Sequence, residues 1–264
     1  MQVRSYAKIN WALRIIGKRA DGYHDIETLF QTISLHDTIT ITQAERMSIA
    51  CDDPHVPCDE TNLVMRAAHA LGAPPVHFAL QKRIPTGGGL GGGSSNAAAT
   101  LMALDEMFEL RTPHERMHEI ALALGSDVPF FLVGGRAYAT GRGEQLTLLP
   151  AGAPIPLLLL FPHERVSTAE AFSLIREYSK PVGVDRYRQA VDLLDHTDIL
   201  VNDFEKVILP RLPNLKNRLL EARAAWAGMT GSGSTIVGAF RGQEQRDVSR
   251  ASFNDVRCEV AETR

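Results

Sequence analysis

The sequence predicts an α+β protein built from two domains. Strand-like and helix-like patterns are mixed along the whole chain, its 264 residues suffice for two modest cores, and the proline-rich "PAGAPIP" at residues 150–156 is typical of a linker. We therefore expect an N-terminal domain over residues 1–152 and a C-terminal α/β domain over residues 153–264.

Strands are expected where β-branched residues alternate or where short apolar runs occur. These patterns lie at residues 2–16, 37–43, 76–84, 128–150, 157–161 and 235–240. Glycines divide the run at residues 128–150, which therefore predicts two strands or a hairpin.

Helices are expected at residues 61–72, 94–110, 113–125, 168–178, 185–194 and 214–226. The first has a plausible Thr61 cap and stops at Gly72. The second begins at Ser94 or Ser95, and its apolar residues recur every three or four positions. The third ends at Gly125.

Charge and composition exclude several classes of protein. The net charge is -3 and no block of Lys and Arg occurs, which argues against nucleic-acid binding and against a polybasic membrane anchor. The start, "MQVRSYAKIN", lacks the apolar core of a secretory signal, and no apolar run is long enough to cross a bilayer. We expect a cytoplasmic protein that binds neither nucleic acid nor membranes.

The three cysteines, Cys51, Cys58 and Cys258, form an odd and scattered set. Cys51, His55 and Cys58 in "CDDPHVPC" raise the alternative of a zinc site. However, a six-residue gap between the cysteines matches no common zinc spacing, and no second pair follows. A solvated loop with reduced thiols is the favoured interpretation.

The segment "IPTGGGLGGGSSNAAATLMAL" at residues 84–104 places six glycines within seven positions. A flexible linker would be flanked by polar, loop-like sequence. Here a predicted strand precedes the glycines and a predicted helix follows them, which favours a phosphate cradle. The amides and dipole at a helix N-terminus attract anions, and glycines let the backbone approach them closely.

The common phosphate-binding schemes do not fit this loop. A Walker motif that starts at Gly88 has Ser94 where lysine is required. The dinucleotide pattern fits formally from Gly87, but the acidic residues about twenty positions on lie inside the helix and not after a second strand. The sequence also lacks the protein-kinase signatures.

The stretch "PTGGGLGGGSSNAA" at residues 85–98 closely resembles the ATP-binding motif of the GHMP kinases, a family of small-molecule kinases. "GMTGSGSTIVGAF" at residues 228–240 resembles the C-terminal glycine-rich motif of that family. Four further stretches are similar to one branch of it, namely "AKINWALRIIGKRADGYHDIETLFQTI" at 7–33, "NLVMRAA" at 62–68, "LGSDVPFF" at 124–131 and "NDFE" at 202–205.

The resemblance implies a two-domain GHMP kinase architecture with the active site in the cleft between the domains. It implies phosphorylation of the C2 hydroxyl of 4-diphosphocytidyl-2-C-methyl-D-erythritol with ATP and Mg²⁺, by direct in-line transfer, in isoprenoid precursor biosynthesis. The stretch "DGYHDIETLFQ" carries the choice of this cytidine diphosphate substrate. Two alternatives stay open: another GHMP kinase acting on a sugar or amino-acid alcohol, and a catalytically silent ATP-binding module.

The resemblance implies that the glycine loop binds the ATP phosphates through its backbone amides. The loop consists of Pro85, Thr86, Gly87, Gly88, Gly89, Leu90, Gly91, Gly92, Gly93, Ser94 and Ser95. The two serine hydroxyls can touch a phosphate or Mg²⁺, or can simply cap the helix. Asn62 and Lys82 are implied at the adenine site, and no carboxylate stands out as a Mg²⁺ ligand.

Phosphoryl transfer also needs a proton acceptor for the attacking hydroxyl. Asp127, ahead of an apolar run expected to be a strand, is typical of a turn or cap, but the resemblance implies that it is the catalytic base. Lys8 and Asn10 lie two apart on a predicted strand and so share one face. A lone strand lysine is usually solvated, whereas the resemblance implies that Lys8 is catalytic and that Asn10 contacts the methylerythritol part.

The resemblance implies a cytosine site after the "ADG" turn at residues 20–22. Tyr23 stacks on the base and His24 hydrogen-bonds its edge. Phe172 either closes the other side of the base or is a core residue of its helix. Ser167 or Thr168 reaches the hydroxyls or phosphates of the substrate.

Gly231 and Ser232 belong to "TGSGS", which is either a tight turn or a backbone surface facing the ATP loop. We favour the backbone surface, where both residues help to shape the substrate site. For Asp203 of "NDFE", nothing beyond a possible cap follows from the sequence.

Overall fold

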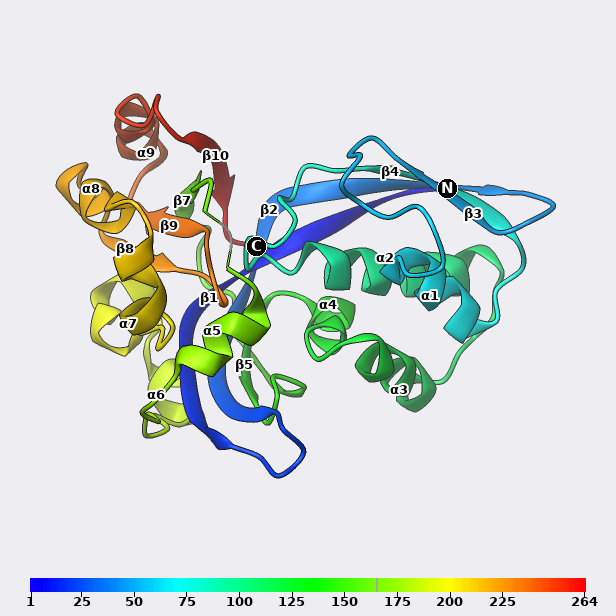
Figure 1. The fold of residues 1–264 in the computed structure, drawn as a ribbon, viewed down its shortest axis with the longest axis horizontal. Helices are drawn as coiled ribbons and strands as arrows, with labels where there is room; N and C mark the ends of the chain where they lie inside the picture. The colour runs from blue at the N-terminus through cyan, green and yellow to red at the C-terminus, as the bar shows by residue number, and fades with distance from the viewer. Residues whose placement is uncertain (165) are drawn as a thin grey trace. The chain divides into compact units, whose positions relative to one another are not determined.

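The chain folds into two compact units that each combine separate stretches of sequence (Figure 1). The computed structural model describes residues 1–164 and 166–264. The first unit comprises Met1–Ala7, Leu35–Thr86 and Gly91–Gly134, and the second comprises Lys8–Ser34, Gly87–Leu90 and Gly135–Arg264. The division into residues 1–152 and 153–264 stays a prediction, because it follows the order of the sequence whereas these units are defined by contacts.

The strands confirm the mixed class. They are β1 (Gln2–Lys18), β2 (His24–Gln43), β3 (Ser48–Cys51), β4 (Val76–Gln81), β5 (Arg136–Thr140), β6 (Gln145–Leu149), β7 (Pro156–Phe161), β8 (Trp226–Met229), β9 (Ile236–Ala239) and β10 (Arg257–Glu262).

The helices lie between these strands along the chain. They are α1 (Leu63–Leu71), α2 (Gly92–Met107), α3 (His114–Leu124), α4 (Val128–Val133), α5 (Thr168–Leu174), α6 (Val184–Gln189), α7 (Glu205–Ile208), α8 (Leu215–Glu221) and α9 (Gln243–Arg250), with short 3-10 turns at Leu193–Asp195, Thr197–Ile199 and Leu209–Arg211. None of the helices in the described part of the chain is both long and apolar enough to span a bilayer.

In the first unit, helices cover one face of a small sheet. Strand β4 pairs in parallel with β3 and antiparallel with residues 38–43 of β2. Figure 1 shows α1 to α4 gathered on one side of these strands. The buried cluster between the layers includes Ile39, Phe78, Val64 and Leu104. Burying these apolar faces is what stabilises the layer of helices on the sheet.

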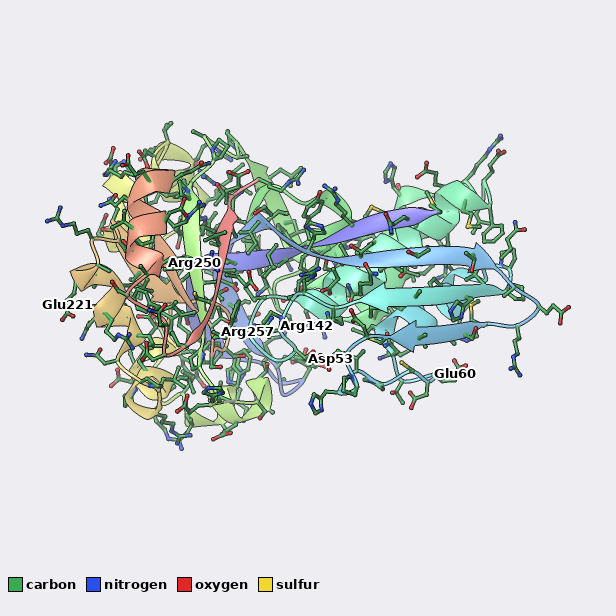
Figure 2. The ribbon with its side chains drawn as sticks, turned by 90° about the horizontal axis from the view of Figure 1, so that it is seen from above. Asp53, Glu60, Arg142, Glu221, Arg250 and Arg257 are labelled. Atoms are coloured by element: carbon green, nitrogen blue, oxygen red, sulfur yellow. The ribbon has the colours of Figure 1, made fainter. Side chains whose placement is uncertain are left out.

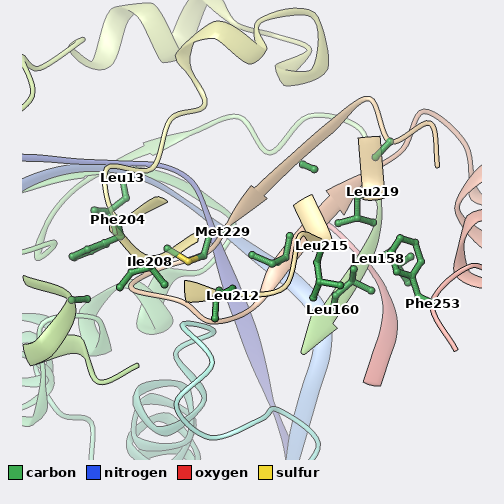
Figure 3. Close-up of a cluster of buried hydrophobic side chains, with 14 of the residues drawn as sticks. Leu13, Leu158, Leu160, Phe204, Ile208, Leu212, Leu215, Leu219, Met229 and Phe253 are labelled. Carbon is green, nitrogen blue, oxygen red and sulfur yellow. The ribbon is translucent and has the colours of Figure 1, made fainter. Parts of the chain in front are cut away.

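The second unit contains an antiparallel sheet in the order β10-β7-β9-β8. Buried leucines of β7 pack against side chains from α8, as the close-up in Figure 3 shows, and side chains from α7 and β8 belong to the same cluster. The cluster includes Leu158, Leu160, Phe204, Leu219 and Met229. Elsewhere in this unit, β5 pairs with residues 28–31 of β2 and with β6.

One predicted strand is a helix. The sequence predicts strands throughout residues 128–150, but residues 128–133 form α4 with Pro129 in its first turn. Proline suits that position because the first helical amides have no intrahelical acceptor. The expected hairpin is confirmed in β5 and β6. Asp127 therefore precedes a helix and not a strand.

Two predicted helix starts are wrong. The cap of α1 is Asn62 and not Thr61, since the Asn62 side chain accepts a hydrogen bond from the amide of Val64 at 2.9 Å. Helix α2 begins within the glycines, with Gly91 as its cap at a φ of 70°, and not at either serine. Glycine tolerates this left-handed backbone, whereas serine would be strained there.

Candidate active site

The glycine loop runs into the first turn of α2. No side chain among the described residues caps this helix. The amides of Gly92, Gly93 and Ser94 lie in its first turn, where helix geometry provides no intrahelical acceptor. These donors and the positive end of the helix dipole are suited to an anion such as a phosphate group.

The two serines of this turn have different surroundings. Ser95 is buried, and its hydroxyl donates to the Tyr6 carbonyl at 2.6 Å and accepts from the Ser5 hydroxyl at 2.7 Å. It is therefore engaged inside the first unit. Ser94 is only half-buried. Of the two hydroxyls, that of Ser94 is the better placed to touch a phosphate.

Asn62 and Lys82 both support the structure of the first unit. Besides capping α1, the Asn62 side chain donates to the Pro57 carbonyl at 2.7 Å. The ammonium group of Lys82 forms an ion pair with the fully buried carboxylate of Asp37. These contacts occupy the polar groups that an adenine site would use, and the adenine role of both residues stays a prediction.

Asp127 lies at the N-terminal end of α4. Its side chain is half-buried and, in the described part of the chain, makes no capping hydrogen bond to the amides of α4. The alternative that Asp127 simply caps this helix is therefore not supported. The turn that carries Asp127 is adjacent to α2, because a Cβ placed on Gly125 would lie 4.0 Å from the Ser94 hydroxyl oxygen. Within the first unit, the turn that leads into Asp127 thus lies beside Ser94.

Lys8 is a buried lysine that contacts the glycine loop. It is 3% exposed, so the interpretation as a solvated strand lysine is wrong. Its ammonium group donates to the Asn10 side-chain oxygen at 2.6 Å and to the Gly89 carbonyl at 2.9 Å. The shared face of Lys8 and Asn10 is confirmed, and these oxygens compensate the buried positive charge.

The two glycine-rich motifs touch within the second unit. A Cβ placed on Gly89 would lie 2.2 Å from the Thr230 carbonyl oxygen, and one on Gly231 would lie 2.9 Å from the Gly89 carbonyl oxygen. Only glycine, which has no Cβ, allows the two backbone segments to approach this closely. The amide of Asn10 donates to the Thr230 hydroxyl at 2.9 Å, and its side chain donates to Thr28 at 2.7 Å. The expected contact between "TGSGS" and the loop is present.

His24 and Phe172 stack directly on each other. Their ring centroids are 4.6 Å apart and their planes differ by 15°. One face of Phe172 is thus covered by the His24 ring, and the expected cytosine sandwich stays a prediction. Tyr23 is exposed, and the guanidinium of Arg142, labelled in Figure 2, lies 4.6 Å from its ring centroid. Burial, and secondarily Lys18, lower the pKa of His24.

The remaining substrate candidates lie at the start of α5 and in "TGSGS". Ser167 caps α5 by accepting from the amide of Glu170 at 3.1 Å. The hydroxyls of Thr168 and Ser232 are hydrogen-bonded at 3.0 Å. Thr168 is therefore the one of the two predicted alternatives that lies beside the C-terminal glycine motif.

Two buried carboxylates have contacts that the sequence does not predict. Asp203 accepts from the amide of Ile15 and from the Ser179 hydroxyl, both at 2.8 Å, and so joins β1 to two later segments. Glu27 is 1% exposed and lies in a stretch of β2, residues 26–33, whose residues are all buried. Because Asp25, Thr28 and Gln31 surround it, the sequence gives no local signal that marks Glu27.

Metal-ligand clusters are not evident in the parts of the chain that the structure describes. Over residues 1–164 and 166–264, no group of three His, Cys, Asp or Glu side chains is placed to hold a metal ion. Cys51, Cys58 and Cys258 are thiols. The cysteines and His55 thus give no support to the zinc alternative.

Comparisons with known proteins identify the family. Residues 62–135 match the family model described as the GHMP kinases N terminal domain. A 4-diphosphocytidyl-2-C-methyl-D-erythritol kinase of Chlorobium phaeobacteroides (strain BS1) is 40% identical over 266 residues, covering 96% of this chain and 92% of the relative. The chain belongs to the family of 4-diphosphocytidyl-2-C-methyl-D-erythritol kinases.

Solved structures agree with membership of this kinase family. The crystal structure of a 4-(cytidine 5'-diphospho)-2C-methyl-D-erythritol kinase matches with a TM-score of 0.85 and 30% identity, over 100% of this chain and 99% of that chain. Homoserine kinase from Cytophaga hutchinsonii matches with a TM-score of 0.69 at 18% identity, over 98% and 95% of the two chains, and shows the fold alone. The expected GHMP kinase fold and small-molecule kinase class are confirmed.

Proposed function

We propose that this chain transfers the γ-phosphoryl group of ATP to the C2 hydroxyl of 4-diphosphocytidyl-2-C-methyl-D-erythritol, a step of isoprenoid precursor biosynthesis. The observation that carries the proposal is the similarity, over nearly the whole chain, to kinases named for this substrate. The free thiols support a cytoplasmic location.

The glycine loop is proposed to bind the ATP phosphates. The first-turn amides of α2 donate to phosphate oxygens, and Ser94 adds a hydroxyl. The close contact of Gly89 with Thr230 supports this role because it fixes the middle of the loop. A loop that is fixed before ATP arrives loses less conformational entropy on binding.

Direct in-line transfer assigns one task to each catalytic residue. The oxygen of the C2 hydroxyl forms a bond to the γ-phosphorus, and the bond from that phosphorus to the bridging oxygen of ADP breaks. Asp127 accepts the proton that the hydroxyl loses. Lys8 supplies positive charge where negative charge develops. Its contacts with Asn10 and Gly89 support this role because they fix the position of the ammonium group.

Mg²⁺ is part of the same proposal. Mg²⁺ prefers oxygen ligands and keeps several waters, so it rarely needs a cage of protein carboxylates. The phosphates would supply most ligands and Ser94 one hydroxyl, and the ion would neutralise charge on the β- and γ-oxygens.

The cytidine group is proposed to bind next to Tyr23, His24 and Phe172. The lowered pKa of His24 keeps its ring neutral near pH 7, so that one ring nitrogen donates and the other accepts a hydrogen bond. Thr168 and Ser232 are proposed to bind the substrate hydroxyls or phosphates, and Asn10 the methylerythritol part.

The test is an assay of ADP release with four candidate acceptors. We expect turnover with 4-diphosphocytidyl-2-C-methyl-D-erythritol and none with galactose, mevalonate or homoserine. Comparable kcat/KM for any of the other three acceptors would overturn the substrate assignment. ATP binding without turnover of any acceptor would instead identify a silent module.

A further inference from the structure

Glu27 is a buried carboxylate that holds an irregular segment of backbone. Its oxygens accept hydrogen bonds from the amide of Val182 at 2.9 and 3.0 Å and from that of Gly183 at 2.8 Å. The Tyr138 hydroxyl donates to it at 2.9 Å. A carboxylate that is 1% exposed needs such donors, because burial without them is costly.

The charge of Glu27 is balanced inside the same unit. Buried Arg14 donates to the Tyr187 hydroxyl at 2.6 Å, and that hydroxyl lies 3.4 Å from Glu27 as a second donor. Burial, with a smaller effect of Glu27, raises the pKa of Tyr138 to about 12, so its hydroxyl remains a donor. Two backbone amides and two tyrosine hydroxyls therefore donate to the buried carboxylate.

The segment that Glu27 holds connects α5 to α6. Residues 175–183 are all described and contain neither helix nor strand. Ile175 packs against the buried cluster of the second unit. Hydrogen bonds hold the rest of the segment: the amides of Val182 and Gly183 on Glu27, the amide of Ser179 on the Ile15 carbonyl at 2.8 Å, and the Ser179 hydroxyl on Asp203. The segment depends on these contacts because it has no helix or strand hydrogen bonds of its own.

This segment passes directly beside His24. The ring of Tyr178, half-exposed, has its centroid 6.4 Å from that of His24. Phe172, at the other end of the connection in α5, stacks on the same histidine. Glu27 itself lies three positions after His24 on β2. One strand thus carries both the histidine and the carboxylate that places the neighbouring segment.

We propose that Glu27 is a positioning residue of the cytidine site, which fixes residues 175–183 so that Tyr178 stays beside His24. This rests on the function proposed above. A purely structural role for Glu27 makes a different prediction: its loss would lower stability without a selective effect on the cytidine substrate.

The test compares Glu27→Gln with Tyr138→Phe. Glutamine has the same shape, but its amino group opposes the backbone N–H donors of Val182 and Gly183. Tyr138→Phe removes a donor to Glu27 and keeps both backbone bonds. We expect Glu27→Gln to raise KM for the cytidine substrate by roughly tenfold, with kcat and KM for ATP changed by less than about twofold.

Tyr138→Phe should lower the melting temperature and change KM for the cytidine substrate by less than about twofold. Equal changes of KM in both variants, or an unchanged KM in Glu27→Gln, would overturn the positioning role. If Glu27→Gln does not fold, Tyr178→Ala decides the question, because that ring is half-exposed and outside the buried network. It should raise KM as Glu27→Gln does, and an unchanged KM would again overturn the proposal.

Failure of the proposed function has a separate signature. Wild-type enzyme that does not turn over the cytidine substrate would refute the function itself. An active wild type together with the negative results above would refute only the role of Glu27.

Discussion

The carboxylate of Asp127 is the single group whose loss should affect chemistry most and binding least. Asp127→Asn keeps the shape of the side chain but removes its capacity to accept a proton. We expect kcat to fall by about 10²–10⁴-fold, the contribution typical of general-base catalysis. ATP affinity, measured by calorimetry, should change by less than about twofold, because the phosphates are proposed to bind to backbone amides.

Asp198→Asn is a suitable control for this experiment. Asp198 is an exposed aspartate whose side chain is 67% accessible and pairs with Arg186 at the surface. Surface ion pairs contribute little, so this variant should retain wild-type kinetics. Near-normal kcat in Asp127→Asn would show that another group accepts the proton.

His24 should give the enzyme a measurable pH dependence. Because its pKa is lowered from the ordinary 6.5, mainly by burial, the neutral ring persists to a lower pH than usual. The sign follows: kcat/KM for the cytidine substrate should fall toward low pH, where the ring becomes charged, with a midpoint below pH 6.5. KM for ATP should not share this change.

A His24→Gln variant separates this histidine from other titrating groups. Glutamine retains a donor and an acceptor but does not titrate in this range. The low-pH decrease should disappear in the variant. Its persistence, or a decrease centred above pH 6.5 in the wild type, would contradict the assignment.

At the residue scale, local geometry decides what the sequence can predict. Lys8 and Asn10 were expected on one face because strand alternation fixes it. Glu27 was missed because its partner Val182 lies 155 positions away, and nothing local announces such a bond. The sequence predicts Ser95 beside a phosphate or Mg²⁺, or at the helix cap. Its hydroxyl instead donates a hydrogen bond to the carbonyl of Tyr6, which is distant in the sequence.

At the scale of elements, the glycine loop offers a matched pair of substitutions. Gly87 and Gly89 both have left-handed backbones, at φ of +76° and +75°. A Cβ on Gly87 would meet nothing within 4 Å, whereas one on Gly89 would lie 2.2 Å from the Thr230 carbonyl oxygen. Gly87→Ala thus adds only backbone strain, about 1–2 kcal/mol. Gly89→Ala adds the same strain and a backbone clash.

We therefore expect Gly89→Ala to lower the free energy of unfolding more than Gly87→Ala does, and to raise KM for ATP more. Urea unfolding and steady-state kinetics measure the two effects. Equal effects of the two substitutions would mean that the loop can move away from Thr230 without losing stability or ATP binding. The contact with Thr230 would then not position the loop.

The elements most easily predicted have a long, regular pattern. Strand β1 and helix α3 follow their patterns closely, since 17 and 11 residues provide several periods. Helix α4 was expected to be a strand because its six residues are nearly all apolar and show no period. Pro129 in the first turn and Gly134 after the last were the local signals of a helix.

At the scale of the whole molecule, contacts between residues group the chain differently from the order of its sequence. Each unit combines separate segments, and β1 and β2 each contribute residues to both. The proline-rich stretch at residues 150–156 lies inside the second unit, where Ile155 exchanges hydrogen bonds with Thr263 at 2.9 and 3.1 Å. Such contacts between distant segments have no local pattern that could predict them.

ATP and the cytidine nucleotide should protect separate segments of the backbone from hydrogen exchange, because they are proposed to bind different segments. Amides that bind a ligand or become ordered exchange more slowly. We expect a non-hydrolysable ATP analogue to slow exchange at residues 85–95. Cytidine 5'-diphosphate should slow it at residues 23–27 and 175–183. The Asp127→Asn variant should show both patterns, since its proposed defect lies in chemistry and not in binding. Protection by the cytidine nucleotide confined to residues 85–95 would instead place its phosphates in the loop and contradict the proposed cytidine site.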